Sequence, residues 1–329
     1  MADIRPFLLK PSDSLAEAMA RVSTNGEGFA AVADPKRNLV GTFCDRDGRL
    51  AMLRGVSLDV AVEDVMAPEL TKLARLPGKL VLDNGVVVDV VPRDRAPVDA
   101  MVMAGGKGTR LRAVTGTVPK PLLSLGRSTI VERILGRLGK AGVNDVFLSL
   151  NYRAGQFKKR IGDGSAVGVS VKYVEEPAPL GTAGALSLLP AKGADLVFVS
   201  NADLITSVDY ARLFDFHRSQ GGSVTMAAAT VTTHVKFGVV HAKRSGLLER
   251  MEEKPQLQFF CNAGMYVLDR SVLELVPKDT FFPMTELLDA VRAAGGDVHV
   301  FPMWEKWVDA GSPEEFQQVL IDFATGEQT

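Results

Sequence analysis

The sequence has few cysteines and histidines, the residues that build disulfide frameworks and many metal sites. Its two cysteines, Cys44 and Cys261, lie far apart, so a disulfide-stabilised scaffold is excluded. Its four histidines lack the close spacing of a metal site; they are His217, His234, His241 and His299. Classes of protein that depend on disulfides or on metals bound by cysteine and histidine are therefore excluded.

An excess of charge of one sign and long apolar runs are also missing. The formal net charge is −1 and the isoelectric point is near 6.5, so no broad basic surface favours nucleic acid or an anionic membrane. No apolar run approaches the length of a membrane span, and the first residues, MADIRPFLLKPSD, lack the apolar core of a signal peptide. We therefore expect a cytoplasmic protein with neither a nucleic acid nor a membrane as partner.

The length of the chain favours two domains. It has 329 residues, of which 46% are hydrophobic and 23% charged, a composition typical of soluble globular proteins. Residues 93–97, which read RDRAP, are charged and end in proline, as linkers often do. We place a first domain at residues 1–95 and a second at residues 96–329.

The second domain shows the alternation of strands and helices that a doubly wound sheet requires. Residues 237–268 instead read as several strands in succession, so the sheet is expected to be mixed and the fold class α/β. The remaining predicted strands are 98–104, 146–150, 169–174, 196–200, 224–231 and 298–301, and the predicted helices are 129–141, 156–161, 182–189, 210–219, 283–294 and 313–323.

A glycine-rich stretch between residues 98 and 123 indicates a phosphate-binding loop. A short apolar run leads into Gly105, Gly106 and Gly108, whose backbone can approach a ligand closely. The loop is neither a dinucleotide fingerprint, which needs a third glycine where Leu111 stands, nor a P-loop, which needs Ser or Thr after the lysine. Positive charge for phosphate oxygens is supplied by Lys107, Arg110, Arg112 and Lys120.

Six motifs in order give the chain a specific resemblance. They read AGGKGTRLR with PKPLL, PLGTAG, NAD, EKP, NAG and WVDAG, and span about residues 98–325. In this the chain resembles the sugar-1-phosphate nucleotidyltransferases, also called NDP-sugar pyrophosphorylases. The resemblance implies a Rossmann-like nucleotidyltransferase domain that joins a nucleoside triphosphate (NTP) and a sugar 1-phosphate and releases pyrophosphate.

The resemblance also assigns site residues. It implies Arg110, Lys120, Asp203 and Asp309 as catalytic residues. For the nucleotide it implies Ala104, Gly105, Gly106, Gly108, Thr109, Glu176, Gly181 and Thr182, and for the sugar phosphate Gly238, Glu253, Lys254, Asn262 and Gly264. Glu252 is an alternative to Glu253, since sequence separates the two only by register.

Asp203 and Asp309 are expected to bind Mg²⁺. Asp203 follows the predicted strand 196–200 and so lies at a strand's carboxyl end, where open α/β sheets bind ligands. Magnesium takes one or two carboxylates together with substrate phosphates, and the family places its metal ligands at these two motifs. The alternative is that each aspartate caps a helix.

Glu176 is expected to read the base. A carboxylate accepts from guanine N1–H and N2–H₂ together, a pairing that uracil cannot supply, so GTP is favoured. Taken together with its N-terminal region, the chain resembles the glucosamine-1-phosphate guanylyltransferases. Mannose-1-phosphate guanylyltransferase, a UTP- or dTTP-using enzyme and an inactive regulatory homologue remain alternatives.

The first domain resembles a CBS module, an α+β unit that often works in pairs. Ser14 and Glu17 can cap a first helix, followed by strands 29–33 and 39–43 and a helix 47–53. A second, shortened repeat follows around residues 81–94. Because the repeat is short and Cys44 replaces a hydroxyl residue, a structural or dimerising role is preferred to nucleotide sensing, and a homo-oligomer is expected.

Overall fold

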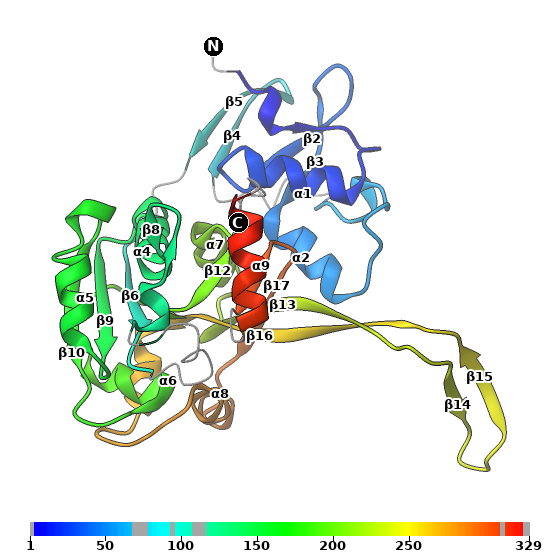
Figure 1. Cartoon of the computed structure of the whole chain (residues 1–329). Helices are drawn as coiled ribbons and strands as arrows, with labels where there is room; N and C mark the ends of the chain where they lie inside the picture. Colours follow the sequence, from blue (N-terminus) through cyan, green and yellow to red (C-terminus); the bar gives the residue numbers. More distant parts are fainter. Residues whose placement is uncertain are drawn as a thin grey trace.

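The computed structural model describes residues 3–67, 78–92, 96–106, 116, 118–309 and 313–324. Its centre is a seven-stranded sheet with the order β10-β9-β6-β11-β16-β13-β17 (Figure 1). These strands are β10 (Ser170–Glu175), β9 (Asp145–Leu150), β6 (Val98–Met103), β11 (Leu196–Asn201), β16 (Gln256–Asp269), β13 (Val224–His234) and β17 (Val298–Met303). The first four are mutually parallel and β16 runs against its two neighbours, so the predicted mixed sheet of an α/β domain is confirmed.

Helices cover both faces of this sheet, which explains why its strands are apolar without alternation. In β6, Ala100 and Val102 pack into one core while Met101 packs into the other. One face is covered by α4 (Ile130–Lys140), α5 (Ala154–Ile161), α7 (Tyr210–Gln220) and α9 (Pro313–Ala324). The other face is covered by α6 (Gly181–Gly184), the 3₁₀ helices η7 (Ala185–Leu188) and η8 (Arg270–Leu275), and α8 (Met284–Ala293).

Local sequence sets several of these boundaries. Helix α4 begins with a capping box in which Thr129 and Glu132 satisfy each other's backbone N–H groups. The helix predicted at 182–189 forms only in part: α6 is followed by the 3₁₀ helix η7. Glycines at 181 and 184 explain the difference, because glycine disfavours a regular helix.

Two short strand pairs and two single-turn helices complete the second half of the chain. The pairs are β7 (Ser124–Leu125) with β8 (Ser128–Thr129), and β12 (Leu204–Thr206) with β18 (Trp307–Asp309). The single turns are η5 (Lys120–Leu122) and η6 (Ser165–Val167). Both β12 and β18 adjoin residues that the sequence assigns to the site.

The N-terminal unit has its own small core. It contains a three-stranded sheet of β1 (Leu8–Leu9), β2 (Phe29–Ala33) and β3 (Leu39–Cys44), with helices η1 (Arg5–Phe7), α1 (Leu15–Thr24), α2 (Asp45–Leu53) and η2 (Val62–Asp64). Ser14 and Glu17 form the predicted capping box of α1. The predicted second repeat is the hairpin β4 (Gly78–Asp83) and β5 (Val86–Pro92), which packs Val87 against Ile4 and Ala31.

A buried arginine joins the two halves of the chain. Arg49 on α2 is fully buried and forms ion pairs of 2.6 Å with both Asp45 and Glu305. Its guanidinium also donates to the carbonyl of Pro302 at 2.7 Å and lies 3.8 Å from the ring centroid of Trp304. The N-terminal unit therefore rests on the segment that leads into β18.

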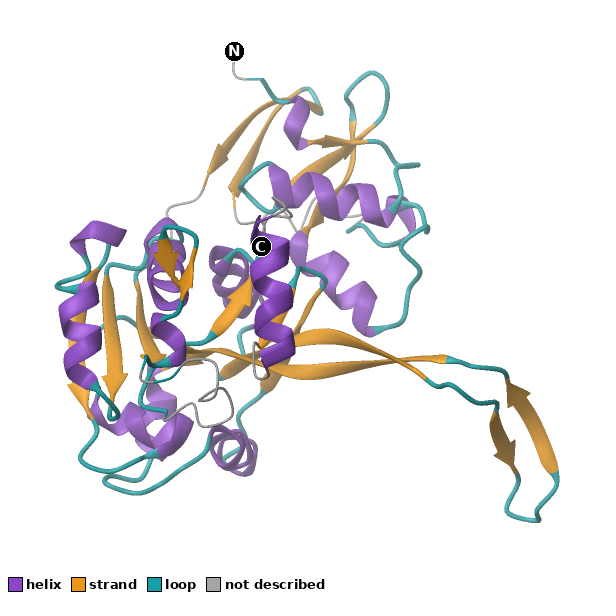
Figure 2. Ribbon diagram, viewed as in Figure 1, coloured by secondary structure: helices purple, strands orange, loops and turns teal. Residues whose placement is uncertain are grey.

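A long two-stranded arm leaves the body of the molecule (Figure 2). It is formed by residues 230–260, comprising the outer ends of β13 and β16 and the hairpin β14 (Val239–Ala242) and β15 (Leu248–Glu252). The inner half of β16 is buried, whereas residues 256–260 are exposed on both faces. The arm is thus a ribbon with no helix over it.

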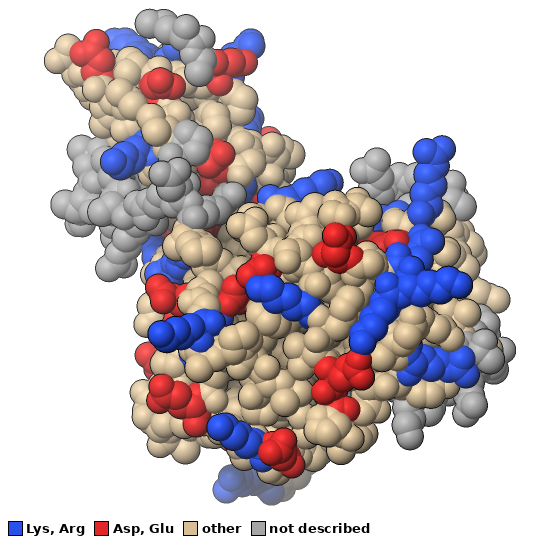
Figure 3. Space-filling model, turned by 90° about the vertical axis from the view of Figure 1, so that its left-hand side faces the viewer, with Lys and Arg blue, Asp and Glu red and all other residues tan. Residues whose placement is uncertain are grey.

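Charges of both signs alternate on the face formed by α5 and β10 (Figure 3). Lys172 pairs with Asp145 at 2.7 Å, Arg160 pairs with Glu132 at 2.9 Å, and Lys158 pairs with Glu175. None of the helices in the described part of the chain is long and apolar enough to cross a membrane.

Candidate active site

The candidate site lies where the parallel strands of the central sheet end. The loop Ala104 to Gly106 follows β6, Glu176 follows β10, and Asp203 follows β11. Parallel strands present their carboxyl ends at one edge, so these residues converge although the sequence separates them widely. The strand β16 runs the opposite way and reaches the same edge with its residues before Met265, which pairs with Ser200.

Lys120 holds the two predicted metal ligands together. Its ammonium lies 2.7 Å from Asp203 Oδ2 and 3.0 Å from Asp309 Oδ1, and its side chain is only 6% exposed. Pro119 and Pro121 fix the backbone on either side of the lysine. The three groups together carry one net negative charge, which favours a further cation at the carboxylates.

The pairing of β12 with β18 places the aspartates side by side. Leu204 pairs with Asp309, so the residue after Asp203 lies opposite the second carboxylate. Asp203 lies in the turn directly before β12 and binds Lys120, and helix α7 is capped by Asp209, so the alternative in which Asp203 caps a helix is wrong.

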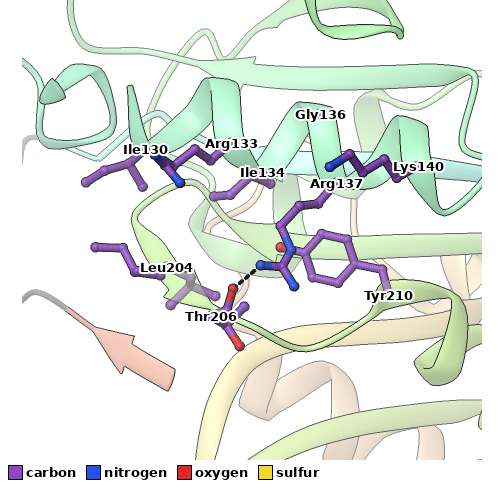
Figure 4. A pocket seen from close by; sticks show the side chains of 10 residues that line it. Ile130, Arg133, Ile134, Gly136, Arg137, Lys140, Leu204, Thr206 and Tyr210 are labelled. Carbon is purple, nitrogen blue, oxygen red and sulfur yellow. Dashed lines mark hydrogen bonds between the residues drawn. The ribbon is translucent and has the colours of Figure 1, made fainter. Parts of the chain in front are cut away.

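Arg137 on α4 binds the end of β12 on the side away from the two aspartates' pocket. It lines a separate pocket of about 290 Å³ between α4, β12 and Tyr210 (Figure 4). Its guanidinium donates to the carbonyl of Thr206 and, at 2.6 Å, to that of Val208. Burial raises the pKa of Tyr210 to about 12, so its hydroxyl stays neutral beside the guanidinium. Because none of the predicted site residues lines this pocket, we assign it a supporting role.

Most of the predicted nucleotide-binding residues line one pocket of about 300 Å³. It is lined by predicted residues that include Ala104, Gly105, Gly106, Lys120, Glu176, Gly181, Thr182 and Asp203. At Gly105 a Cβ would lie 2.6 Å from Glu176 Oε1, so only glycine allows this close approach. Arg110, Gly108 and Thr109, together with Lys107 and Arg112, lie outside the described residues.

The carboxylate of Glu176 already has partners within its own loop. Ser149 donates its hydroxyl to Oε1 at 2.5 Å, and the backbone N–H of Leu180 donates to Oε2 at 2.9 Å. Glu176 therefore both lines the pocket and orders residues 176–180. Its predicted role as the reader of guanine stays a prediction.

An adjoining pocket of about 240 Å³, called the sugar-side pocket, is lined by two of the predicted sugar-phosphate residues. It shares Thr182 and Asn201 with the first pocket and is also lined by Asn262, Gly264 and Asp309. Gly264 adopts a φ of 70°, and a Cβ there would lie 2.6 Å from Asn201 Nδ2, so glycine is required. Asn262 accepts the N–H of Gly264 at 3.0 Å, which fixes its amide at the pocket wall.

Three predicted sugar-phosphate residues lie elsewhere. Gly238, Glu253 and Lys254 are on the arm and line neither pocket. The first two lie together across the arm, since a Cβ on Gly238 would be 2.9 Å from Glu253 Oε2. The structure therefore places these three residues on the arm and away from the two pockets of the same chain.

Two residues at the site were not singled out from the sequence. Asn201 lines both pockets, and its only signal was its place in the NAD motif. Phe281 lines the nucleotide pocket and is 64% exposed. An exposed aromatic residue on a pocket wall suits stacking on a base.

The carboxylates fit a magnesium ion. Within the described residues, the carboxylates of Asp203 and Asp309 make no hydrogen bond other than those to Lys120, so each has an oxygen left for a metal. No group of three or more potential metal ligands occurs in the same part of the chain. Two carboxylates suffice for Mg²⁺ when substrate phosphates supply further ligands.

The fold is that of an α/β domain with a candidate site at the carboxyl ends of its parallel strands, and comparison with known proteins gives its family. Residues 99–325 match the family described as "Nucleotidyl transferase". The chain belongs to this nucleotidyltransferase family, and the resemblance seen in the sequence is confirmed.

Similar proteins include mannose-1-phosphate guanylyltransferases. The chain is 35% identical over 236 residues to the enzyme of that name from Mycobacterium tuberculosis, covering 70% of this chain and 65% of the relative. It is 34% identical to the mannose-1-phosphate guanyltransferase of Debaryomyces hansenii, covering 68% and 64%. The chain thus spans slightly less than two thirds of the length of these relatives.

Solved structures share the fold. The crystal structure of HddC from Yersinia pseudotuberculosis has a TM-score of 0.54 and 27% identity, covering 68% of this chain and 99% of that one. A second structure of HddC is complexed with GMP-PN and has 26% identity, a TM-score of 0.54 and the same coverage.

Proposed function

We propose that the protein is a sugar-1-phosphate nucleotidyltransferase. The observation that carries this is the Lys120–Asp203–Asp309 cluster at the junction of two pockets that share Asn201 and Thr182. The junction would hold an α-phosphate between a nucleotide on one side and a sugar phosphate on the other. Both substrates are anions, so the site must neutralise and align charge more than it must remove a proton.

The reaction follows from this arrangement. A phosphate oxygen of the sugar 1-phosphate attacks the α-phosphorus of the NTP, the bond from that phosphorus to the bridging oxygen breaks, and pyrophosphate leaves with the bonding electrons. Lys120 donates to the developing negative charge, and Arg110 is proposed to bind the departing pyrophosphate. An in-line geometry of this kind needs no general base, because the nucleophile is already ionised.

GTP and mannose 1-phosphate are the proposed substrates. The similar curated proteins are named mannose-1-phosphate guanylyltransferases, and a similar structure holds GMP-PN. This supports the mannose alternative better than the glucosamine reading preferred from the sequence. The nucleotide pocket offers Glu176 and Phe281 for recognition of the base, and the adjoining pocket offers Asn262 and Gly264 for the sugar.

Asp203 and Asp309 are proposed to hold Mg²⁺ with the substrate phosphates. The ion would supply charge stabilisation for the phosphoryl oxygens. The residues of the chain hold its ligands in place: Lys120 bridges the two carboxylates and the β12–β18 pair fixes their spacing.

For the N-terminal unit we propose a CBS-like module with a structural role. Its sheet and helices α1 and α2 follow the strand and helix order that the sequence predicts. The ion pair between Arg49 and Glu305 attaches the unit to the second half of the chain, and this contact needs no bound nucleotide.

A pyrophosphate-release screen tests the proposed function. GTP, UTP, dTTP and ATP should each be combined with mannose, glucose and glucosamine 1-phosphates in the presence of Mg²⁺. The highest kcat/KM is expected for GTP with mannose 1-phosphate, and the variant Asp203→Asn should be inactive. Absence of pyrophosphate from every combination would favour the inactive homologue.

A further inference from the structure

The sugar-side pocket lacks a basic residue. Within the described residues, no lysine or arginine lines it, and the nearby Lys120 is already paired with two carboxylates. The sugar 1-phosphate, a dianion near neutral pH, needs positive charge on this side. Within its own chain the described part of the site is therefore incomplete.

The arm, residues 230–260, carries the missing charge. It has five basic residues against three acidic ones, although the whole chain has a net charge of −1. Lys254 is exposed, adopts a φ of 46° and makes no side-chain hydrogen bond or ion pair within the described residues. A non-glycine residue in the left-handed region is uncommon and often marks a functional position.

The arm cannot place Lys254 at the pocket of its own chain in the observed conformation. Asn262 lines the pocket, and Gln256 lies six residues earlier in the same continuous strand. At about 3.3 Å per residue this separates the two by about 20 Å. Figure 1 shows the arm leading away from the body, with β14 and β15 at its far end.

The arm exposes apolar side chains of the kind that a protein interface buries. Eight of the eighteen exposed large apolar residues of the described chain lie on it: Phe237, Val240, Leu247, Leu248, Met251, Leu257, Phe259 and Phe260. A two-stranded ribbon with apolar side chains on both faces is at best marginally stable in water. Burial of these side chains against a partner would stabilise the arm.

We propose that the partner is a second copy of this chain and that the arm of each copy completes the sugar-phosphate site of the other. This inference rests on the proposed function. The arm of one copy lies across the body of its partner, buries its apolar side chains there, and places Lys254 and Glu253 at the sugar-side pocket. A two-fold exchange of this kind satisfies both pockets with the same contact. Lys254 binds the sugar phosphate, and Glu253 accepts from a sugar hydroxyl.

Complementation between two inactive variants tests the proposal. One variant, Asp203→Asn, has a defective pocket and an intact arm; the other, Lys254→Ala, has an intact pocket and a defective arm. The two are co-expressed with different affinity tags, and the heterodimer is purified through both tags. Arm exchange creates one intact site in each heterodimer, so about half of the wild-type activity is expected.

Every other result overturns the proposal. If each chain uses its own arm, the heterodimer is as inactive as the two parent variants. Failure to recover heterodimers would show that the copies do not associate, and full activity of Lys254→Ala would show that the arm supplies no essential group. The control Lys243→Ala, on the same arm, should leave activity unchanged. Inactivity of the wild-type protein would instead reject the proposed function.

Discussion

At the scale of single residues, Lys120 is the group on which the site depends most directly. It is almost fully buried, whereas Asp203 and Asp309 are 33% and 41% exposed. Water can therefore solvate the carboxylates if the lysine is lost, but no other described side chain replaces its charge.

Lys120→Met should abolish most activity without unfolding the protein. We expect kcat/KM to fall by about two to four orders of magnitude, because the phosphate charge in the transition state is left uncompensated. Steady-state pyrophosphate release and thermal unfolding measure the two effects. Lys172→Met, which breaks only an exposed ion pair with Asp145, is the matched control and should be neutral.

Glu176 poses a different question, since its carboxylate both faces the pocket and ties its own loop. If it reads guanine, Glu176→Gln should reduce the ratio of kcat/KM for GTP over UTP by about tenfold or more. Ser149→Ala removes one of the loop contacts but keeps the carboxylate, so it should lower kcat/KM for GTP and for UTP by the same factor. Equal effects of the two variants on the GTP/UTP ratio would assign Glu176 to loop structure alone.

At the scale of elements, the position of β12 decides whether the two aspartates meet. Arg137 on α4 anchors the end of this strand through two carbonyls, although it touches neither predicted substrate pocket. It is a positioning residue, and its removal should act on turnover through the geometry of Asp203 and Asp309.

Arg137→Met is expected to lower kcat by about tenfold with little change in KM for GTP. Lys140 lines the same pocket from the exposed side of α4, so the variant Lys140→Met provides the control. Kinetics and melting temperature should be measured together. A lower melting temperature with unchanged kcat would reduce Arg137 to a stabilising role.

The junction of α7, β13 and β16 gives the protein a defined response to acid. His217 is buried, with Nδ1 2.9 Å from Thr225 Oγ1 and Nε2 3.2 Å from Asp269. Burial lowers its pKa, although Asp269 opposes the shift. The folded state therefore binds fewer protons at this site than the unfolded state, and stability falls as the pH drops below about 6.5.

His217→Gln should remove this part of the pH dependence. The free energy of unfolding of the wild-type protein is expected to fall between about pH 7 and pH 5, by roughly 1.4 kcal/mol for each unit by which the pKa is lowered. Urea unfolding at intervals across this range measures it. Parallel curves for the two proteins would show that His217 does not contribute.

At the scale of the whole molecule, the N-terminal unit and the catalytic half share a buried charge network. Arg49 connects α2 to Glu305, four residues before Asp309, and Trp304 packs against the core of the N-terminal unit. The network joins the N-terminal unit to the second half of the chain, and the division into domains at residues 1–95 and 96–329 stays a prediction.

Arg49→Met should destabilise the protein by about 3–5 kcal/mol, because Asp45 and Glu305 are left in a poorly solvated site. A double-mutant cycle with Glu305→Gln isolates the pair. Coupling of less than about 0.5 kcal/mol would contradict a direct role for the ion pair across the interface.

The sequence by itself determined the class of fold and named residues from separate motifs for a candidate site. The alternation of strands and helices predicted a doubly wound sheet, and glycines followed by basic residues predicted the phosphate loop. Lys120, Asp203 and Asp309 were chosen from separate motifs, and the structure brings them within hydrogen-bonding distance. Local chemistry of this kind is readable because each motif carries its own physical reason.

Only the tertiary structure decided how the distant parts combine. The antiparallel course of β16 brings Asn262 and Gly264 to the site yet carries Lys254 away from it, and sequence order cannot show this because strand direction depends on pairing. The short helix at α6 and the roles of Arg137 and Arg49 likewise follow from contacts between residues far apart in the chain. Such contacts depend on which surfaces the fold brings together, and no stretch of sequence contains that information alone.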